Sequence, residues 1–270
     1  MENGMETNLL GTAPIGKLMM KYAVPSVISL LVNALYNIVD QIFIGQGVGY
    51  LGNAATNVIF PLTVIVLAFS LLVGDGAAAY LSLKLGEGRR DEAQRGVGNA
   101  VVLLVFFGIL FLVLGLLFLK PLADLFGATE NSLPYALDYG GIIVLGFPFV
   151  VIGTGLNSCI RAEGSPKVAM LSMIAGAAVN TVLDPVFIFV CGWGVEGAAL
   201  ATILGQILTF FVSTLYLRRP KLLRISRRDL KLSARTARTV MGYGVSSFIT
   251  QLAITISVLA SNNMIVQYGT

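Results

Sequence analysis

Seven apolar stretches dominate this sequence, and each is long enough to cross a lipid bilayer as a helix. A bilayer core needs about 20 apolar residues in helical conformation. Only 12% of the residues are charged, about half of the roughly 25% that is typical of soluble domains. The chain is therefore predicted to be an all-α polytopic membrane protein. The seven stretches lie near residues 22–44, 57–82, 98–119, 138–158, 168–190, 197–217 and 240–267.

The basic residues predict the orientation of these spans. If the N-terminus faces the cytoplasm, 17 of the 18 Lys and Arg residues fall in cytoplasmic segments and only Lys120 lies outside. Cytoplasmic loops carry an excess of Lys and Arg, so we expect a multi-pass plasma (cytoplasmic) membrane protein with its N-terminus inside. The basic segment 218–239 has no interleaved aromatic residues for base stacking. We expect it to meet anionic lipid headgroups rather than nucleic acid.

A weak internal repeat suggests how the spans are grouped. The segment Tyr22–Leu31 and the segment Tyr243–Leu252 agree at five of ten positions. Six spans separate them, so both helices would run in the same direction, as in a parallel repeat of two lobes. We expect residues 1–217 to form a six-helix N-terminal lobe and residues 218–239 a basic cytoplasmic linker. Residues 240–270 would be the first helix of a truncated second lobe, whose remaining helices are missing.

Three aspartates lie within the predicted spans, where an ionisable group is costly unless it is paired or faces a cavity. Asp40 ends a polar stripe of the first span, which also holds Asn33, Tyr36 and Asn37 at spacings of three and four residues. Asn180 and Asp184 are four residues apart in the fifth span, as are Thr202 and Gln206 in the sixth. The third aspartate, Asp75, lies nearer the inner end of the second span, where we expect cytoplasmic solvation.

Depth brings four of these residues together. At 1.5 Å per residue, Asp40, Asp184 and Thr202 all fall about 6–9 Å below the outer ends of their spans, and Asn180 is one turn from Asp184. Carboxylate, amide and hydroxyl oxygens at one depth suit Na⁺, or a proton shared between two carboxyl groups. The alternative is that these residues only hold helices together by hydrogen bonds. Pro185 would free the carbonyl of Thr181 from its helical hydrogen bond.

The two cysteines, Cys159 and Cys191, are predicted to lie near opposite faces of the membrane. A disulfide between them is therefore not expected. Two thiols without any histidine are too few ligands for a metal site of their own, so no metal is expected there. We expect both cysteines to have packing roles.

The motifs around the aspartates resemble the multidrug and toxin extrusion (MATE) family. The resemblance rests on the segments Tyr36–Gly45, Leu85–Gly88, Asn180–Pro185 and Gly194–Thr202, and it covers the whole chain. It implies two six-helix lobes that export cationic or amphipathic drugs in exchange for Na⁺ or H⁺, with no cofactor and no enzymatic activity.

The resemblance also implies roles for individual residues. It places the coupling-cation site of the N-terminal lobe on Asp40, Asn180, Asp184 and Thr202, the same four residues that depth selects. It associates Tyr139 and Asn157 with the cavity of that lobe. Together with the polar stripe, the substrate cavity is expected to involve Asn33, Tyr36, Asn37, Tyr139, Asn157 and Gln206.

Two other functions share individual features with this sequence. A lipid-linked sugar flippase of the same superfamily would be expected to hold intramembrane Arg or Lys for the pyrophosphate, and these spans have none away from their ends. An intramembrane aspartyl protease would resemble a Tyr-Asp pair with Gly-x-Gly-Asp, but Val39 precedes Asp40 and Leu72 occupies the first glycine position. The sequence Gly47–Gly52 matches a dinucleotide fingerprint only in its letters, because it lies in a loop between two spans.

Overall fold

The computed structural model describes residues 14–218, 226 and 228–268. This part of the chain folds into seven long helices and one short π-helix. The element bounds are α2 (Ile15–Gly47), α3 (Tyr50–Gly86), α4 (Arg90–Leu125), α5 (Leu133–Ala162), α6 (Pro166–Pro185), the π-helix η1 (Val186–Val190), α7 (Gly194–Arg218) and α8 (Ala234–Tyr268).

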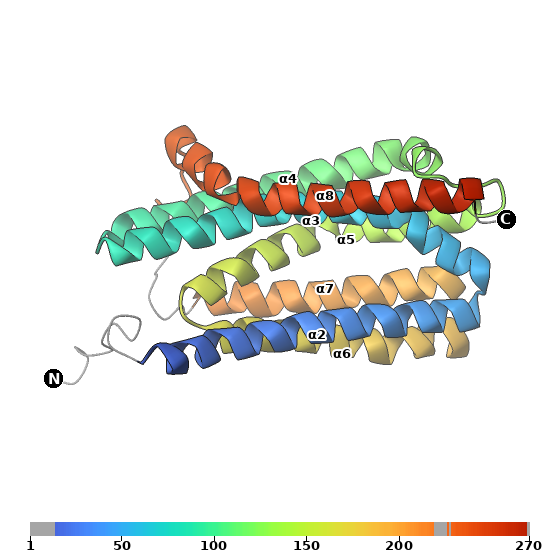
Figure 1. Ribbon diagram of the computed structural model, residues 1–270, viewed down its shortest axis with the longest axis horizontal. Coiled ribbons are helices and arrows are strands. Elements are labelled where there is room, and N and C mark those ends of the chain that lie inside the picture. Colours follow the sequence, from blue (N-terminus) through green and yellow to red (C-terminus); the bar gives the residue numbers. More distant parts are fainter. Residues whose placement is uncertain (1–13, 219–225, 227, 269–270) are drawn as a thin grey trace.

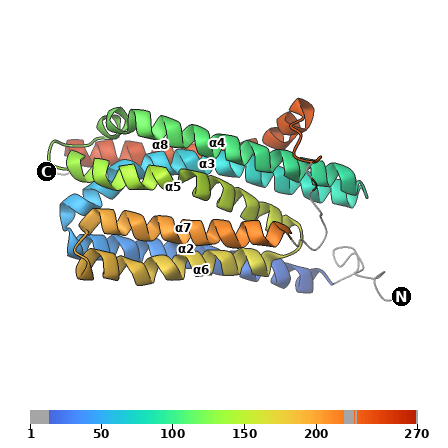
Figure 2. The ribbon, with the colours of Figure 1, turned by 180° about the vertical axis from the view of Figure 1, so that it is seen from behind.

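The helices form two layers, which are visible from both sides (Figures 1 and 2). Helices α3, α4, α5 and α8 lie side by side in one layer, and α2, α6 and α7 form the other. Helix α5 joins the layers, because it packs against α3 and α4 on one side and against α7 on the other. Helix α2 packs mainly against α6 and makes little contact with α3, its neighbour in sequence.

All seven helices are long and apolar enough to cross a membrane. Large apolar side chains cover much of the outer surface, among them Leu30 and Leu35 on α2 and Phe106 and Leu117 on α4. Exposing so large an apolar surface to water is unfavourable, whereas lipid chains can cover it. The predicted class, an all-helical membrane protein with seven spans, is confirmed.

The helices extend beyond the apolar stretches that predicted them. Helix α8 begins at Ala234, inside the segment 218–239 that was predicted to be a linker. Polar residues at the end of a span can continue a helix into the headgroup region, because helix formation requires no apolar side chain there. Of the predicted linker, residues 219–225 and 227 lie outside the described part of the chain.

Small residues allow neighbouring helices to approach closely, as is common in membrane bundles. A Cβ atom on Gly74 of α3 would lie 2.6 Å from the Cα of Gly155 on α5. A Cβ on Gly205 of α7 would lie 2.6 Å from the carbonyl oxygen of Gly176 on α6. These contacts hold α3 against α5 and α6 against α7, and thereby fix the helices that carry the polar residues.

The segment before α8 is attached to the start of α4 through one side chain. Asn99 accepts a 2.7 Å hydrogen bond from the backbone N–H of Ser233 through Oδ1. Its Nδ2 donates to the backbone carbonyl of Lys231 at 3.2 Å. Beside it, a Cβ on Gly98 would clash with the backbone carbonyl of Asp229. Residues 229–233 are thus seated directly on α4.

Candidate cation site

Four polar side chains meet where α2, α6 and α7 come together. Asp40 lies near the C-terminal end of α2, Asn180 and Asp184 lie in the last two turns of α6, and Thr202 lies in the third turn of α7. The exposed fractions of Asp40, Asn180 and Asp184 are 7%, 2% and 0%, and Thr202 is half-buried. The structure therefore brings together the four residues that the sequence placed at one depth.

Asn180 forms hydrogen bonds with both Asp184 and Thr202. Its Nδ2 donates to Asp184 Oδ1 at 3.2 Å and to Thr202 Oγ1 at 3.3 Å. The carboxyl groups of Asp40 and Asp184 lie close enough to interact directly across the contact between α2 and α6. Two buried carboxylates at such close range repel each other unless a cation or a proton lies between them.

Several oxygen atoms of this cluster have no hydrogen-bond partner. They are Asp40 Oδ1, Asn180 Oδ1 and Asp184 Oδ2, and all three are buried. The amide of Asn180 donates through its nitrogen, which leaves its carbonyl oxygen free to act as a ligand. Buried oxygens without a partner are costly, so three of them in one cluster point to a positively charged occupant.

The backbone beside Asp184 departs from α-helical geometry. Pro185 ends α6, and η1 follows at once as a π-helical turn over Val186–Val190. Proline cannot donate a backbone hydrogen bond, and π-helical turns inside longer helices are often found at functional sites. The predicted disturbance of the helix at Pro185 is present, although its form as a π-turn was not predicted.

Two tyrosines and a glutamine surround the carboxyl groups. Tyr36 on α2 and Tyr139 on α5 lie close enough to interact electrostatically with Asp40 and Asp184. Gln41 contacts Asp40 and accepts a 3.2 Å hydrogen bond from Thr56 Oγ1 through its Oε1. Gln41 was missed in the sequence, where only its position directly after Asp40 could have drawn attention to it.

The remaining residues assigned to a substrate cavity do not all lie together. Asn33 and Asn37 share one face of α2, where Asn37 Nδ2 donates to the Asn33 backbone carbonyl at 2.7 Å. Gln206 is half-buried on α7, one turn beyond Thr202. Asn157 is 18 residues from Tyr139 on α5, about 27 Å along the helix axis. It donates to Ser172 Oγ at 2.7 Å at the opposite end of the bundle.

A cavity of about 550 Å³ lies beside the C-terminal half of α2. Asn37, Gln41, Gln46 and Asn53 line it together with apolar residues of α2. Its volume lies within the range of about 300–1,000 Å³ that is usual for small-molecule sites. It carries carboxamides and no charged side chain.

No Lys or Arg within the described ranges forms an ion pair with either carboxylate of the cluster. Across residues 14–218, 226 and 228–268, no group of three or more His, Cys, Asp or Glu comes together. The donor set at the cluster is therefore two carboxylates, an amide and a hydroxyl, which are oxygen ligands suited to a hard cation. Cys159 is buried and Cys191 is exposed, and neither is in a disulfide.

Seven helices able to span a membrane, three of which contribute to a buried cluster of oxygen ligands, are typical of a polytopic membrane transporter. The MatE family profile matches residues 25–186, more than half of the chain. The chain belongs to this MATE family, whose members are transporters and not enzymes.

Individual relatives agree with this assignment. The chain is 30% identical over 206 residues to the FAD transporter of Shewanella oneidensis, covering 75% of this chain and 45% of that protein. It is 26% identical over 260 residues to the multidrug export protein MepA of Staphylococcus haemolyticus, covering 94% of this chain and 57% of that protein. The chain thus spans about half the length of the curated relatives it matches.

A solved structure shows the same arrangement of helices. A MOP superfamily transporter from Pyrococcus furiosus is 26% identical and superimposes with a TM-score of 0.89. The match covers 99% of this chain and 60% of that transporter. It confirms that the chain has the fold of roughly the N-terminal half of a MATE transporter.

Proposed function

We propose that this chain belongs to a cation-coupled exporter and that Asp40, Asn180, Asp184 and Thr202 bind the coupling cation. The observation that carries the proposal is the group of three buried, unpartnered oxygens on Asp40, Asn180 and Asp184. Burying an unpaired carboxylate costs several kcal/mol even after relaxation. A cation held between the two carboxylates would remove most of that cost.

The coupling ion is Na⁺ or H⁺ in this proposal. For Na⁺, the free oxygens of Asp40, Asn180 and Asp184 and the hydroxyl of Thr202 would supply ligands from three helices. For H⁺, Asp40 and Asp184 would share the proton. In both cases binding draws α2 towards α6 and α7, so that occupancy of the site is linked to the packing of the bundle.

The test compares the unfolding temperature of the purified chain in Na⁺ and in choline at constant ionic strength. If Na⁺ is the ligand, a concentration of 100 times its dissociation constant stabilises the protein by about 2.7 kcal/mol. If H⁺ is the ligand, Na⁺ has no effect and the chain becomes more stable on acidification through protonation of the pair. Asp184→Asn should abolish either response.

Asp184→Asn also distinguishes a cation site from a cluster that merely joins helices. Removing one of two repelling carboxylates should raise the stability of the cation-free chain, whereas breaking a structural hydrogen-bond cluster should lower it. Asp124→Asn, at the end of α4 and away from the cluster, is the matched control and should keep the wild-type cation response. An unchanged response in Asp184→Asn would contradict the proposal.

For the transported solute we propose cationic or amphipathic drugs. Support comes from the name of a relative, a multidrug export protein, and from the carboxamide-lined cavity beside Asn37 and Gln41. Asn33, Tyr36, Tyr139 and Gln206 would contribute on the same side of the bundle. A fluorescent cationic dye should bind the purified chain, and Asn37→Leu should weaken that binding.

We further propose that residues 1–217 act as one lobe, that the segment 218–239 joins it to a second, and that α8 is the first helix of that second lobe. The distribution of Lys and Arg supports an N-terminus in the cytoplasm. The end of the bundle with the α3–α4 and α5–α6 turns would then face the cytoplasm, and Asp40 and Asp184 would lie nearer the outside.

A further inference from the structure

A second polar network lies at the opposite end of the bundle from the cation cluster. Asp75 on α3 accepts a 2.7 Å hydrogen bond from Ser158 Oγ of α5 through Oδ1. Its other oxygen, Oδ2, accepts a 2.8 Å bond from Ser247 Oγ of α8. Arg161, one turn beyond Ser158, donates to Ser158 Oγ through Nη2 at 2.9 Å. A carboxylate and a guanidinium are therefore held apart by a single hydroxyl group.

Neither charge in this network is neutralised by direct contact. Within the described residues, the ion pairs all belong to the α3–α4 turn, and none involves Asp75 or Arg161. In the described part of the chain, the guanidinium also donates to the Asn157 Oδ1 atom, through Nη1 at 3.2 Å. A guanidinium has five N–H donors and a carboxylate about four acceptor positions, so both groups retain capacity for a ligand.

Both charges border a cavity of about 470 Å³. Its wall is formed by Asp75, Ser158 and Arg161, by Tyr22 and Ser26 of α2, and by small residues that include Ala79. The volume is within the usual range for small-molecule sites. The lining includes Ala78, Ala79 and Ala162, whose small side chains leave the charged groups accessible from the cavity. The lining residues belong to α2, α3 and α5, and Figure 1 shows α2 in one layer and α3 and α5 in the other.

The pairing of charges selects the kind of ligand. A simple anion would be attracted by Arg161 and repelled by Asp75. A simple cation would be attracted by Asp75 and repelled by Arg161. At such short separation in a partly buried site, the two effects are of similar size. A molecule with an ammonium group and an anionic oxygen group a few bonds apart would satisfy both.

We propose that the cavity at Asp75 and Arg161 is a binding site for a small zwitterion, separate from the cation cluster. The ammonium group would lie against the Asp75 carboxylate, and the carboxylate or phosphate of the ligand would accept from Arg161. Two sources carry this chemistry: a soluble amphoteric solute and the phosphoethanolamine headgroup of a lipid. Because Asp75 also accepts a hydrogen bond from Ser247 of α8, the ligand would bind a carboxylate that joins α8 to the rest of the bundle.

The soluble source is tested by calorimetric titration of the purified chain in a non-ionic, lipid-free detergent. β-Alanine is compared with propionate, which lacks the ammonium group, and with ethylamine, which lacks the carboxylate. The expected result is that β-alanine binds at least tenfold more tightly than either. Propionate or ethylamine binding as tightly as β-alanine would overturn the proposal.

The lipid source is tested with the same chain in nanodiscs of phosphatidylethanolamine and phosphatidylglycerol in equal parts. Native mass spectrometry then counts the lipids that remain bound after release from the disc. Preferential retention of phosphatidylethanolamine identifies the headgroup as the ligand, and binding of β-alanine alone identifies a soluble solute. If β-alanine does not bind and phosphatidylethanolamine is not preferentially retained, the proposal is overturned.

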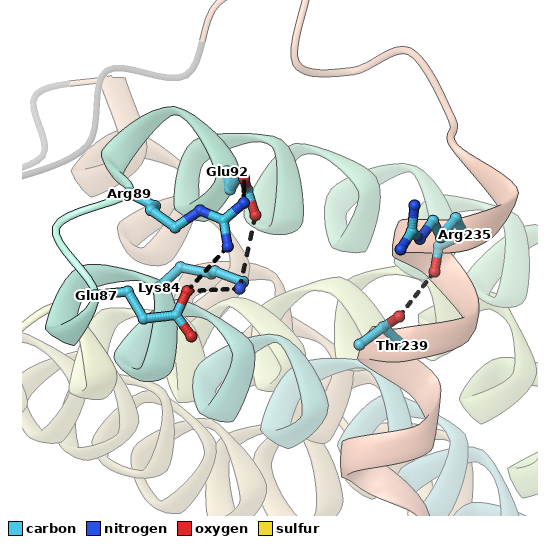
Figure 3. A network of polar contacts seen from close by, with 6 residues as sticks. All are labelled: Lys84, Glu87, Arg89, Glu92, Arg235 and Thr239. Atoms are coloured by element: carbon cyan, nitrogen blue, oxygen red, sulfur yellow. Dashed lines mark hydrogen bonds and ion pairs between the residues drawn. The ribbon is translucent and has the colours of Figure 1, made fainter.

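Variants assign the binding to the cavity. Arg161→Gln and Asp75→Asn should each weaken binding at least tenfold. Ala79→Leu fills the cavity without altering any hydrogen bond of the network, so it should block binding in a chain that still folds. Arg89→Gln removes a positive charge of the α3–α4 turn (Figure 3), which does not line the cavity, and this variant should bind like the wild type. Unchanged binding in both Arg161→Gln and Ala79→Leu would place the ligand elsewhere.

Discussion

Gly244 of α8 lies against the backbone carbonyl of Leu72 on α3, so closely that a Cβ atom on this glycine would overlap with it. One turn further along α3, Gly76 meets the backbone carbonyl of Val240 in the same way. Two glycines, one on each helix, thus let α3 and α8 cross backbone against backbone. The hydrogen bond between Ser247 and Asp75 closes the same contact.

This crossing predicts that two glycines of one helix respond oppositely to the same substitution. Gly244→Ala should destabilise the chain by about 1–3 kcal/mol, because an extra methyl group at a tight contact forces the helices apart. Gly242→Ala has nothing within 4 Å of its added Cβ, and alanine favours helix by up to about 1 kcal/mol over glycine. Thermal unfolding in detergent measures both, and equal effects would contradict this crossing.

The spans and the cation cluster could be predicted because the position of a residue within its span gives its depth in the membrane. Apolar length marks each span, and a rise of 1.5 Å per residue gives depth within it. Asp40, Asp184 and Thr202 fall at one depth by this measure alone, without any knowledge of contacts between their helices. The structure adds that α2, α6 and α7 pack so that these three residues also lie next to one another at that depth.

The direction in which each helix faces could not be predicted. Lipid-facing and protein-facing residues of a span are both apolar, so the sequence pattern does not distinguish them. Asp75 was expected to be solvated, and it does border a cavity. Its hydrogen bonds from Ser158 and from Ser247, which is 172 residues away, were not predicted. Asn157 was assigned to a cavity with Tyr139, and the structure places it with Ser172 and Arg161.

Asn99 is predicted to be important for the position of the segment that leads into α8. Asn99→Ala removes the partners of the Ser233 N–H and the Lys231 carbonyl. Both bonds are part-buried, and losing such a bond costs about 0.5–1.5 kcal/mol. We expect lower thermal stability and faster proteolysis near Lys231. Thr239→Ala is the control, because Thr239 Oγ1 donates to the Arg235 carbonyl within its own helix (Figure 3). Equal proteolysis in both variants would show that Asn99 does not hold this segment.

The turn between α3 and α4 should show a shifted titration. Lys84 donates a 2.7 Å hydrogen bond to Glu87, and this contact, with help from Arg89, lowers the pKa of the Glu87 carboxyl below its ordinary value (Figure 3). The interaction is therefore complete above the ordinary pKa of glutamate and is lost as the pH falls through the lowered value. Lys84→Met should raise the pKa of Glu87, as followed by NMR of ¹³C-labelled glutamate. An unchanged pKa in that variant would mean that Lys84 does not act on Glu87 in solution.

The two native cysteines provide a test of the proposed orientation without added tags. Cys191 is exposed directly after η1, at the end of the bundle near Asp184, whereas Cys159 is buried between α3 and α5. A membrane-impermeant maleimide added to intact cells should therefore label Cys191 if that end faces the outside, and Cys159 should not react. Cys191→Ser should abolish the labelling and Cys159→Ser should leave it unchanged. Labelling of Cys191 only after the cells are opened would place this end in the cytoplasm and reverse the orientation that the basic residues predict. The cation cluster would then be nearer the cytoplasmic face, and the zwitterion cavity at Asp75 and Arg161 nearer the outer face.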